Sequence, residues 1–165
     1  YKPTFYTSGP DTEPMSVLEE SGIRVIKVGP EIGQASALKM CYAAMNKGTI
    51  AINIAVLTTA KMLGVYESLV TELGHSQNDV LKKMQKMNEI PTKADRWIGE
   101  MLEISNTFES AKVTGLFHMG AADIYDFVSK TEPALNETPE TYNSDRTLEE
   151  LISIFASHIR GGDNI

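Results

Sequence analysis

The chain has 165 residues, enough for one domain with a substantial core, or for one domain and part of another. Its hydrophobic fraction of 42% and charged fraction of 22% are typical of a globular protein. The net charge of -7 excludes binding to nucleic acid or to an anionic membrane by bulk electrostatics, and we expect neither as a partner.

The single cysteine and the apolar runs bear on the compartment. Because Cys41 is the only cysteine of the sequence, an intrachain disulfide is excluded and a reducing compartment is favoured. The helix-forming residues around it predict a buried, inert thiol. No signal-peptide pattern opens the chain, and the apolar run at 49–60 ("TIAINIAVLTTA") is shorter than a bilayer span. We therefore expect a soluble, cytoplasmic protein.

The first part of the chain reads as a strand, a short helix and a second strand. Residues 3–7 and 23–29 carry the β-branched and aromatic residues of strands, and the second segment alternates apolar with polar positions. Residues 15–22 ("MSVLEESG") between them predict a short amphipathic helix. Two strands are marginal alone, so we expect them to belong to a larger sheet.

After Gly29 the sequence predicts helices. The longest runs from Gly33 to about Leu63, with Gly64 suited to its C-terminal cap. Its run "AINIAVL" is apolar on all sides, which predicts heavy burial.

Further helices follow along the chain. One opens near Thr92, which is spaced from Asp95 like a capping box, and it carries the apolar stripe of Trp97, Met101, Ile104 and Phe108. After a helix at 116–128 and a polar loop, Thr147 and Glu150 predict the capping box of a last helix.

Lys39 is a charged residue on the long helix, and its helical neighbours are small or polar. The face that contains it comprises Ala35, Ser36, Tyr42, Ala43, Asn46, Thr49 and Asn53. One interpretation is a lysine whose aliphatic stem lies along packed surface while its amine reaches water. The other is that Lys39 points into a cleft, where burial would make a proton-accepting amine more accessible.

Other candidates for chemistry are weaker. His75, His118 and His158 are far apart and lack paired ligand spacing, so we expect no metal site. Arg96 and Glu100 stand four residues apart on a helix, which predicts a solvated ion pair. The stretch around Lys39 contains neither a P-loop nor the dinucleotide-binding glycine fingerprint.

Two stretches carry a family resemblance. Residues 23–40 ("IRVIKVGPEIGQASALKM") resemble the β-hydroxyacid dehydrogenase superfamily, which includes 6-phosphogluconate and 3-hydroxyisobutyrate dehydrogenases. Residues 96–128 resemble a less-studied 6-phosphogluconate dehydrogenase-like branch, whose C-terminal helical domain was long catalogued as of unknown function. The resemblance implies a mainly α fold. Residues 1–29 would be the last strand–helix–strand of a Rossmann domain, and residues 30–165 an all-helical substrate and dimerisation domain.

The resemblance also implies a reaction. The protein would be an NAD(P)-dependent oxidoreductase that transfers a hydride from the hydroxyl-bearing carbon of a β-hydroxy acid, in some members with decarboxylation. Lys39 would be the general base and then the acid. Gly33, Tyr42, Ala43 and Asn46 would be substrate-binding positions, and Glu100 a cofactor-binding position.

The sequence departs from the family at the positions after the lysine. Relatives often carry His and then Asn where this chain has Tyr42 and Ala43. The glycine-rich nucleotide loop is absent from the sequence, so NADP or NAD would be bound mainly by a domain outside this chain, and we expect the chain alone to be inactive. We expect a homodimer that acts on a small hydroxy acid. The alternative is a non-catalytic helical module for dimerisation or ligand binding.

Overall fold

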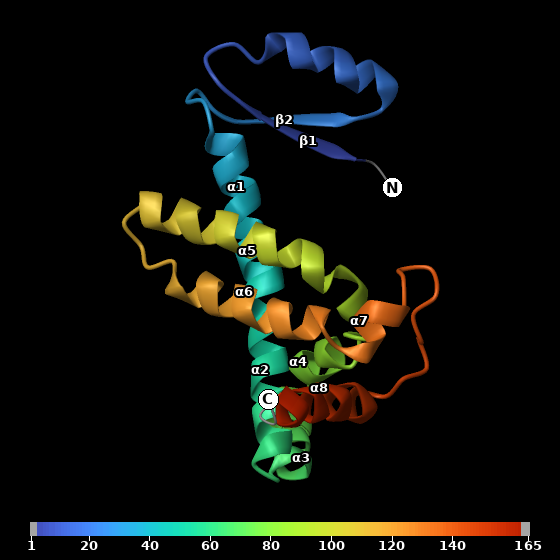
Figure 1. Cartoon of the computed structure of the whole chain (residues 1–165). Helices are drawn as coiled ribbons and strands as arrows, with labels where there is room; N and C mark the ends of the chain where they lie inside the picture. The colour runs from blue at the N-terminus through green and yellow to red at the C-terminus, as the bar shows by residue number, and fades with distance from the viewer. Residues whose placement is uncertain (1–2, 163–165) are drawn as a thin grey trace. The chain divides into compact units, whose positions relative to one another are not determined.

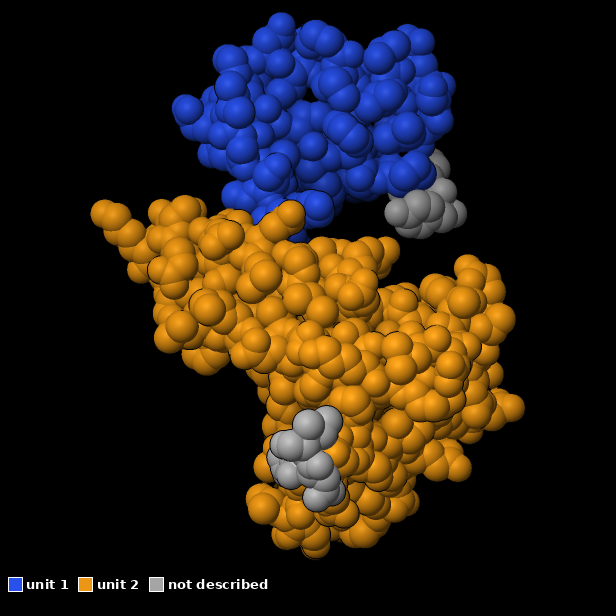
Figure 2. All heavy atoms as spheres, viewed as in Figure 1, with its two compact units in different colours: residues 1–43 blue, residues 44–165 orange. Residues whose placement is uncertain are grey.

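The structure is a computed structural model and describes residues 3–162 of the chain. The chain forms two compact units, Tyr1–Ala43 and Ala44–Ile165, which are coloured separately in Figure 2. The described residues are mostly helical with two short parallel strands, which confirms the predicted mainly α fold. The assignment of residues 1–29 to a Rossmann domain stays a prediction.

The first unit contains the strand–helix–strand segment and the start of the long helix. Its elements are β1 (Thr4–Ser8), the 3-10 helix η1 (Glu13–Ser21), β2 (Arg24–Gly29) and α1 (Gln34–Ala43) (Figure 1). β1 pairs with β2 in parallel, with Tyr6 opposite Ile26, and the register shifts between Thr7 and Ser8. Parallel strands need a crossover, and η1 supplies it. The predicted strands are therefore confirmed.

The second unit is entirely helical in its described residues. Its elements are the π-helical turn η2 (Ala44–Gly48), α2 (Thr49–Met62), α3 (Tyr66–Ser76), α4 (Asn78–Met84), α5 (Pro91–Ser110), α6 (Leu116–Ser129), α7 (Glu132–Asn136) and α8 (Leu148–Gly162). Figure 1 shows α5 and α6 lying side by side, and both contact η2, whereas α8 packs on α2.

The predicted long helix is present as one helical run from Gln34 to Met62, within which η2 is a π-helical turn. Gly64 lies two residues beyond its end and has a φ of 74°, in the left-handed region. The Gly64 N–H donates to the Lys61 carbonyl and the Val65 N–H to the Ala60 carbonyl, which is the Schellman arrangement. The predicted glycine cap is therefore confirmed.

The core of the second unit lies between α2, α5, α6 and α8. The predicted stripe on α5 faces it, because Met101 and Ile104 are fully buried and Trp97 is 8% exposed. The other hydrophobic residues of this core with no exposed surface are Ile54, Leu57, Ala94, Tyr125, Val128, Leu151, Ile152 and Phe155. The apolar stripe at helical spacing thus identified a buried face from sequence.

The long helix is not buried on all sides in the described residues. One face of α2 enters the core, whereas an opposite stripe of η2 and α2 stays exposed; we call Met45, Thr49, Ile52, Val56, Thr59 and Leu63 the α2 stripe. By length and composition, Gln34–Met62 is the one helix of the described residues that could cross a membrane. It is weak evidence for a span, since a core helix has the same properties and Ile54 and Leu57 are fully buried.

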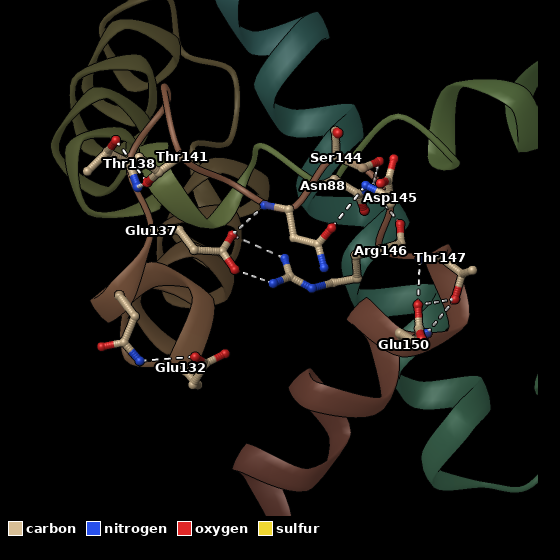
Figure 3. A network of polar contacts seen from close by, with 12 residues as sticks. Asn88, Glu132, Glu137, Thr138, Thr141, Ser144, Asp145, Arg146, Thr147 and Glu150 are labelled. Carbon is tan, nitrogen blue, oxygen red and sulfur yellow. Dashed lines mark hydrogen bonds and ion pairs between the residues drawn. The ribbon is translucent and has the colours of Figure 1, made fainter.

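A polar network holds the loop between α7 and α8 (Figure 3). The Arg146 guanidinium donates to the Glu137 carboxylate, and both side chains are nearly buried. The Asn88 side-chain amide donates to the Ser144 carbonyl at 3.1 Å and also to the Arg146 carbonyl. These contacts satisfy loop carbonyls that lie close to the core.

The two predicted capping boxes have different outcomes. The Thr147 N–H donates to Glu150 at 2.7 Å and the Glu150 N–H to the Thr147 hydroxyl at 3.2 Å, so the box at the start of α8 is confirmed. The prediction of a capping box at Thr92 is wrong. α5 begins at Pro91, which suits a first helical position, and the Thr92 hydroxyl donates back to the Glu89 carbonyl.

The prediction of a buried thiol is also wrong. Cys41 is exposed, because α1 buries no residue in the first unit and contacts the strands along only part of its surface. A helix-forming sequence context therefore did not determine burial at this position.

Candidate functional site

Lys39 lies in a hollow of the first unit, between β1 and α1. The hollow has a volume of 640 Å³ and is lined by Thr4, Phe5, Tyr6, Ala35, Ser36, Leu38, Lys39 and Tyr42. α1 is fixed on β1 at its first turn, because the Ser8 hydroxyl accepts a hydrogen bond from the Ala35 N–H at 3.0 Å. The hollow therefore combines one ammonium group with the hydroxyls of two tyrosines, a serine and a threonine.

The structure brings Lys39 and Tyr42 together, three residues apart on α1 and on the lining of one hollow. Gly33 and Ala43 are not among the lining residues. Gly33 has a φ of 96°, which glycine adopts without strain, and it comes immediately before α1. It thus allows the turn predicted at this point.

Lys39 is exposed in the described structure. The prediction that burial favours a proton-accepting amine required a cleft that removes the lysine from water. The described residues do not provide that burial, because the hollow is open and its wall is a single strand and a single helix. The position of Lys39 in a hollow supports the interpretation of a functional lysine. Its exposure agrees equally well with a lysine whose amine is solvated.

Asn46 and Glu100 lie in the second unit. Asn46 is exposed on η2, whereas the partly exposed Glu100 on α5 is paired with two cations. The Lys47 ammonium lies 2.5 Å from the Glu100 carboxylate, and the Arg96 guanidinium lies 3.4 Å from it. The predicted ion pair of Arg96 and Glu100 is therefore present, but the nearer partner is Lys47, which no sequence pattern indicated.

Lys47 also contacts two aromatic residues of the second unit. Its ammonium lies 5.5 Å from the centroid of the Trp97 ring, a cation–π distance. Its backbone carbonyl accepts a hydrogen bond of 2.6 Å from the Tyr125 hydroxyl. The rings of Trp97 and Tyr125 meet edge to face with centroids 5.2 Å apart. The residue after Asn46 is thus held by both α5 and α6.

No pattern in the sequence identified η2. A π-helical turn requires no particular residue types, so a search for helical periodicity treats residues 34–62 as uniform. The one sequence feature that marks the position of this turn is the charged residue Lys47 beside Gly48, between two apolar parts of the helix.

His118 is buried against η2 and the α5 helix. Its ring meets that of Phe108 at a centroid distance of 4.4 Å, and burial lowers the pKa of its imidazole, so the neutral form is favoured. His75 is exposed and His158 is half-buried. No group of three histidine, cysteine, aspartate or glutamate side chains in residues 3–162 could hold a metal ion.

Part of the chain matches a known family. Residues 60–128 match the family described as "Domain of unknown function (DUF1932)". An uncharacterized 28.5 kDa protein of Methanothermus fervidus, described as lying in the 7S RNA 5' region, is 30% identical over 70 residues. That alignment covers 42% of this chain and 28% of the relative.

Two solved structures are similar to this one. A conserved hypothetical protein from Sinorhizobium meliloti 1021 has a TM-score of 0.79 at 21% identity, over 94% of this chain and 52% of the other. A conserved protein of unknown function, whose structure is described as similar to 3-hydroxyacid dehydrogenases, has a TM-score of 0.62 at 25% identity. The alignment covers 77% of this chain and 50% of that protein. The chain therefore spans about half the length of these proteins.

These findings confirm the resemblance predicted from residues 96–128, where the α5–α6 pair lies. Residues 60–128 are thus similar to the DUF1932 domain, and the fold of the chain is similar to that of a protein described as resembling 3-hydroxyacid dehydrogenases.

Proposed function

We propose that this chain is part of an NAD(P)-dependent oxidoreductase that acts on a β-hydroxy acid, with Lys39 as the general base. The observation that carries the proposal is the position of Lys39 in a hollow that it shares with the Tyr42, Tyr6 and Ser36 hydroxyls. The likeness to a protein described as similar to 3-hydroxyacid dehydrogenases supports the reaction class. Proton transfer by a positioned amine is a chemistry that this arrangement can perform.

In the proposed reaction, the neutral Lys39 amine accepts the proton of the substrate hydroxyl. The carbon that bears this hydroxyl would lose a hydride to NAD(P)⁺, which is the oxidant. The substrate carboxylate would accept hydrogen bonds from hydroxyls of the hollow, with Tyr42 three residues from the base. The protonated Lys39 would then release this proton to water, or, where the keto acid loses CO₂, would donate it as an acid to the carbon of the resulting enolate. Decarboxylation of the resulting keto acid is compatible with this sequence of steps but is not required by it.

The residues of this chain do not by themselves fit a dinucleotide. The sequence lacks the glycine fingerprint that lets backbone approach the pyrophosphate. Glu100, the predicted cofactor-binding residue, is an anion already paired with Lys47 and Arg96, and it would repel a phosphate. We therefore propose that NAD(P) is bound mainly by residues outside this chain, and we assign no step to Glu100.

We also propose that the whole protein is a homodimer. The α2 stripe follows spacings of four and three residues in alternation, which is the periodicity of helices that pair along a seam. It contains no charged residue, and Met45, Ile52 and Leu63 are more than half exposed. An uncharged helix face of this kind is a candidate for burial against a second copy.

The experiment that tests the function is an activity screen of the full-length protein. A panel of β-hydroxy acids, with and without a phosphate group, would be incubated with NAD⁺ or NADP⁺ while reduced cofactor is followed by absorbance. We expect turnover of at least one substrate with one of the two cofactors. Absence of turnover across the panel, together with binding of an acid to the hollow, would instead favour a non-catalytic ligand-binding module.

A further inference from the structure

The second unit has a hollow of its own, between α3, the end of α4 and the start of α8. Its volume is 410 Å³, and every residue that lines it belongs to this unit. It shares no residue with the hollow that contains Lys39. Any ligand of this second hollow would therefore be bound by the helical unit alone.

Asn88 lines this hollow and has one polar atom without a partner. Its side-chain nitrogen donates to the Ser144 and Arg146 carbonyls, which uses both of its N–H groups (Figure 3). The reversed amide would place an oxygen against these two carbonyls, so the orientation of the amide is fixed. Oδ1 is thus turned away from them, and within residues 3–162 nothing donates to it, although Asn88 is only 9% exposed. A buried acceptor of this kind requires a donor from another molecule.

The hollow also carries negative charge. Glu67 and Glu149 line it with their neighbour Tyr66, which is 5% exposed. Burial, and then the carboxylates of Glu149 and Glu67, raise the pKa of the Tyr66 hydroxyl to about 12. Both carboxylates therefore act on this hydroxyl, which stays neutral and keeps an oxygen that can accept a hydrogen bond.

Two cations beside the hollow are already paired. The Arg146 guanidinium donates to Glu137, and the Lys61 ammonium lies 2.7 Å from the Glu149 carboxylate. Among the ion pairs of the described residues, none includes Glu67. The Glu67 carboxylate thus leaves the hollow with a negative charge that these cations do not compensate.

We propose that this hollow binds the primary ammonium group of a small aliphatic amine. An ammonium group carries three N–H donors and no acceptor, which suits the Asn88 oxygen, the Tyr66 oxygen and the Glu67 carboxylate. Val70 and Leu81 also line the hollow and would contact the alkyl chain. The site is distinct from the proposed catalytic hollow and does not depend on the proposed function.

The test is a titration of the full-length protein with n-butylammonium chloride, followed by calorimetry and by the NMR signals of the Asn88 side-chain NH₂. We expect saturable binding and a shift of these signals, because a hydrogen bond to Oδ1 polarises the same amide. Tetramethylammonium carries the same charge without an N–H group. We expect it to bind at least about tenfold more weakly, the effect of losing one charged hydrogen bond.

Glu67→Gln should weaken the binding of n-butylammonium about fivefold, the scale of an exposed charge pair. Glu72→Gln is the matched control. It makes the same change at another exposed glutamate of α3 that does not line the hollow, and it should bind as wild type does.

Four results would overturn the proposal. They are the absence of saturable binding, equal affinity for tetramethylammonium, an unshifted Asn88 amide, and equal affinities of Glu67→Gln and wild type. In each case water would be the donor to the Asn88 oxygen. Because no measurement here involves turnover, these results are independent of whether the protein oxidises a hydroxy acid.

Discussion

Gly115 lies where the chain enters α6 and passes very close to α5. A Cβ atom at this residue would lie 2.4 Å from the Ser105 hydroxyl oxygen and 2.8 Å from the Ser105 carbonyl oxygen. The Ser105 hydroxyl in turn donates to the Gly115 carbonyl at 3.1 Å, and Glu109 accepts the Gly115 N–H at 2.8 Å. Two hydrogen bonds therefore maintain the close approach, and an added Cβ would meet backbone that cannot shift easily.

We predict that Gly115→Ala destabilises the chain by about 1–3 kcal/mol, the range for overpacking a tight site. Gly120→Ala is the matched control in the same helix, because nothing lies within 4 Å of its Cβ position and alanine favours a helix by about 0.5–1 kcal/mol. Urea unfolding followed by circular dichroism measures both. Equal stability of the two variants would show that the approach of Ser105 is not restrictive.

The Glu137–Arg146 pair predicts a pH dependence of stability. The hydrogen bond from Arg146 holds the pKa of the Glu137 carboxyl below its ordinary value of 4.5, against the opposing effect of burial. A lowered pKa means that the pair stabilises the fold fully above pH 4.5, and that this stabilisation is lost as pH falls through the folded-state pKa.

The measurement is the free energy of unfolding of Glu137→Gln between pH 3 and pH 7. We expect the variant to be about 1.5–3 kcal/mol less stable than wild type near neutral pH, the range for a charged hydrogen bond, with the difference shrinking in acid. Glu103→Gln makes the same change on the exposed face of α5 and serves as the control. A difference for Glu137→Gln that is independent of pH would refute the role of the ionised pair.

At the scale of elements, the long helix and its exposed stripe carry the prediction of a dimer. We expect Ile52→Glu to convert a dimeric full-length protein into a monomer, because a charge at the middle of an apolar seam is buried without a partner. Ile52 is 59% exposed in the chain alone, so its substitution should leave the fold of the unit intact. Sedimentation velocity at several protein concentrations reports the mass.

Leu135→Glu on α7 provides the control for this experiment. Leu135 is 71% exposed but lies outside the α2 stripe, so the variant should keep the oligomeric state of wild type. A wild-type monomer, or an Ile52→Glu protein that stays dimeric, would exclude the α2 stripe as the interface.

The elements that sequence predicted well are those with strong local patterns. The stripe from Trp97 to Phe108 identified the buried face of α5, and Gly64 identified the end of the long helix, because period and left-handed φ are local properties. η2 could not be predicted, since its stabilisation comes from Tyr125, which is 78 residues away from Lys47 in sequence. The exposure of Cys41 and the partners of Glu100 likewise depend on tertiary contacts.

At the scale of the whole molecule, the candidate site was predicted in part. The family resemblance selected Lys39 and Tyr42, and the structure gives them a common hollow. Helical spacing placed Ser36 on the same face as Lys39, but the presence of Tyr6 was not anticipated, because its proximity arises from the packing of α1 on β1. The substrate-binding roles of Gly33, Ala43 and Asn46 stay predictions, and so does the cytoplasmic location.

The chain supplies one part of a larger catalytic assembly in our account. It spans about half of each similar solved structure, and the nucleotide loop is not in its sequence. The contribution that we propose for this chain is proton transfer by Lys39.

The most direct test is kcat of Lys39→Ala in the full-length protein, measured with the best hydroxy acid of the screen at saturating NAD(P)⁺. We predict a loss of at least about a hundredfold, the usual contribution of a general base, with a melting temperature close to that of wild type because Lys39 is exposed. Lys27→Ala removes another exposed lysine of the first unit and should retain full turnover. Turnover of Lys39→Ala close to that of wild type would contradict the assignment of Lys39 as the base.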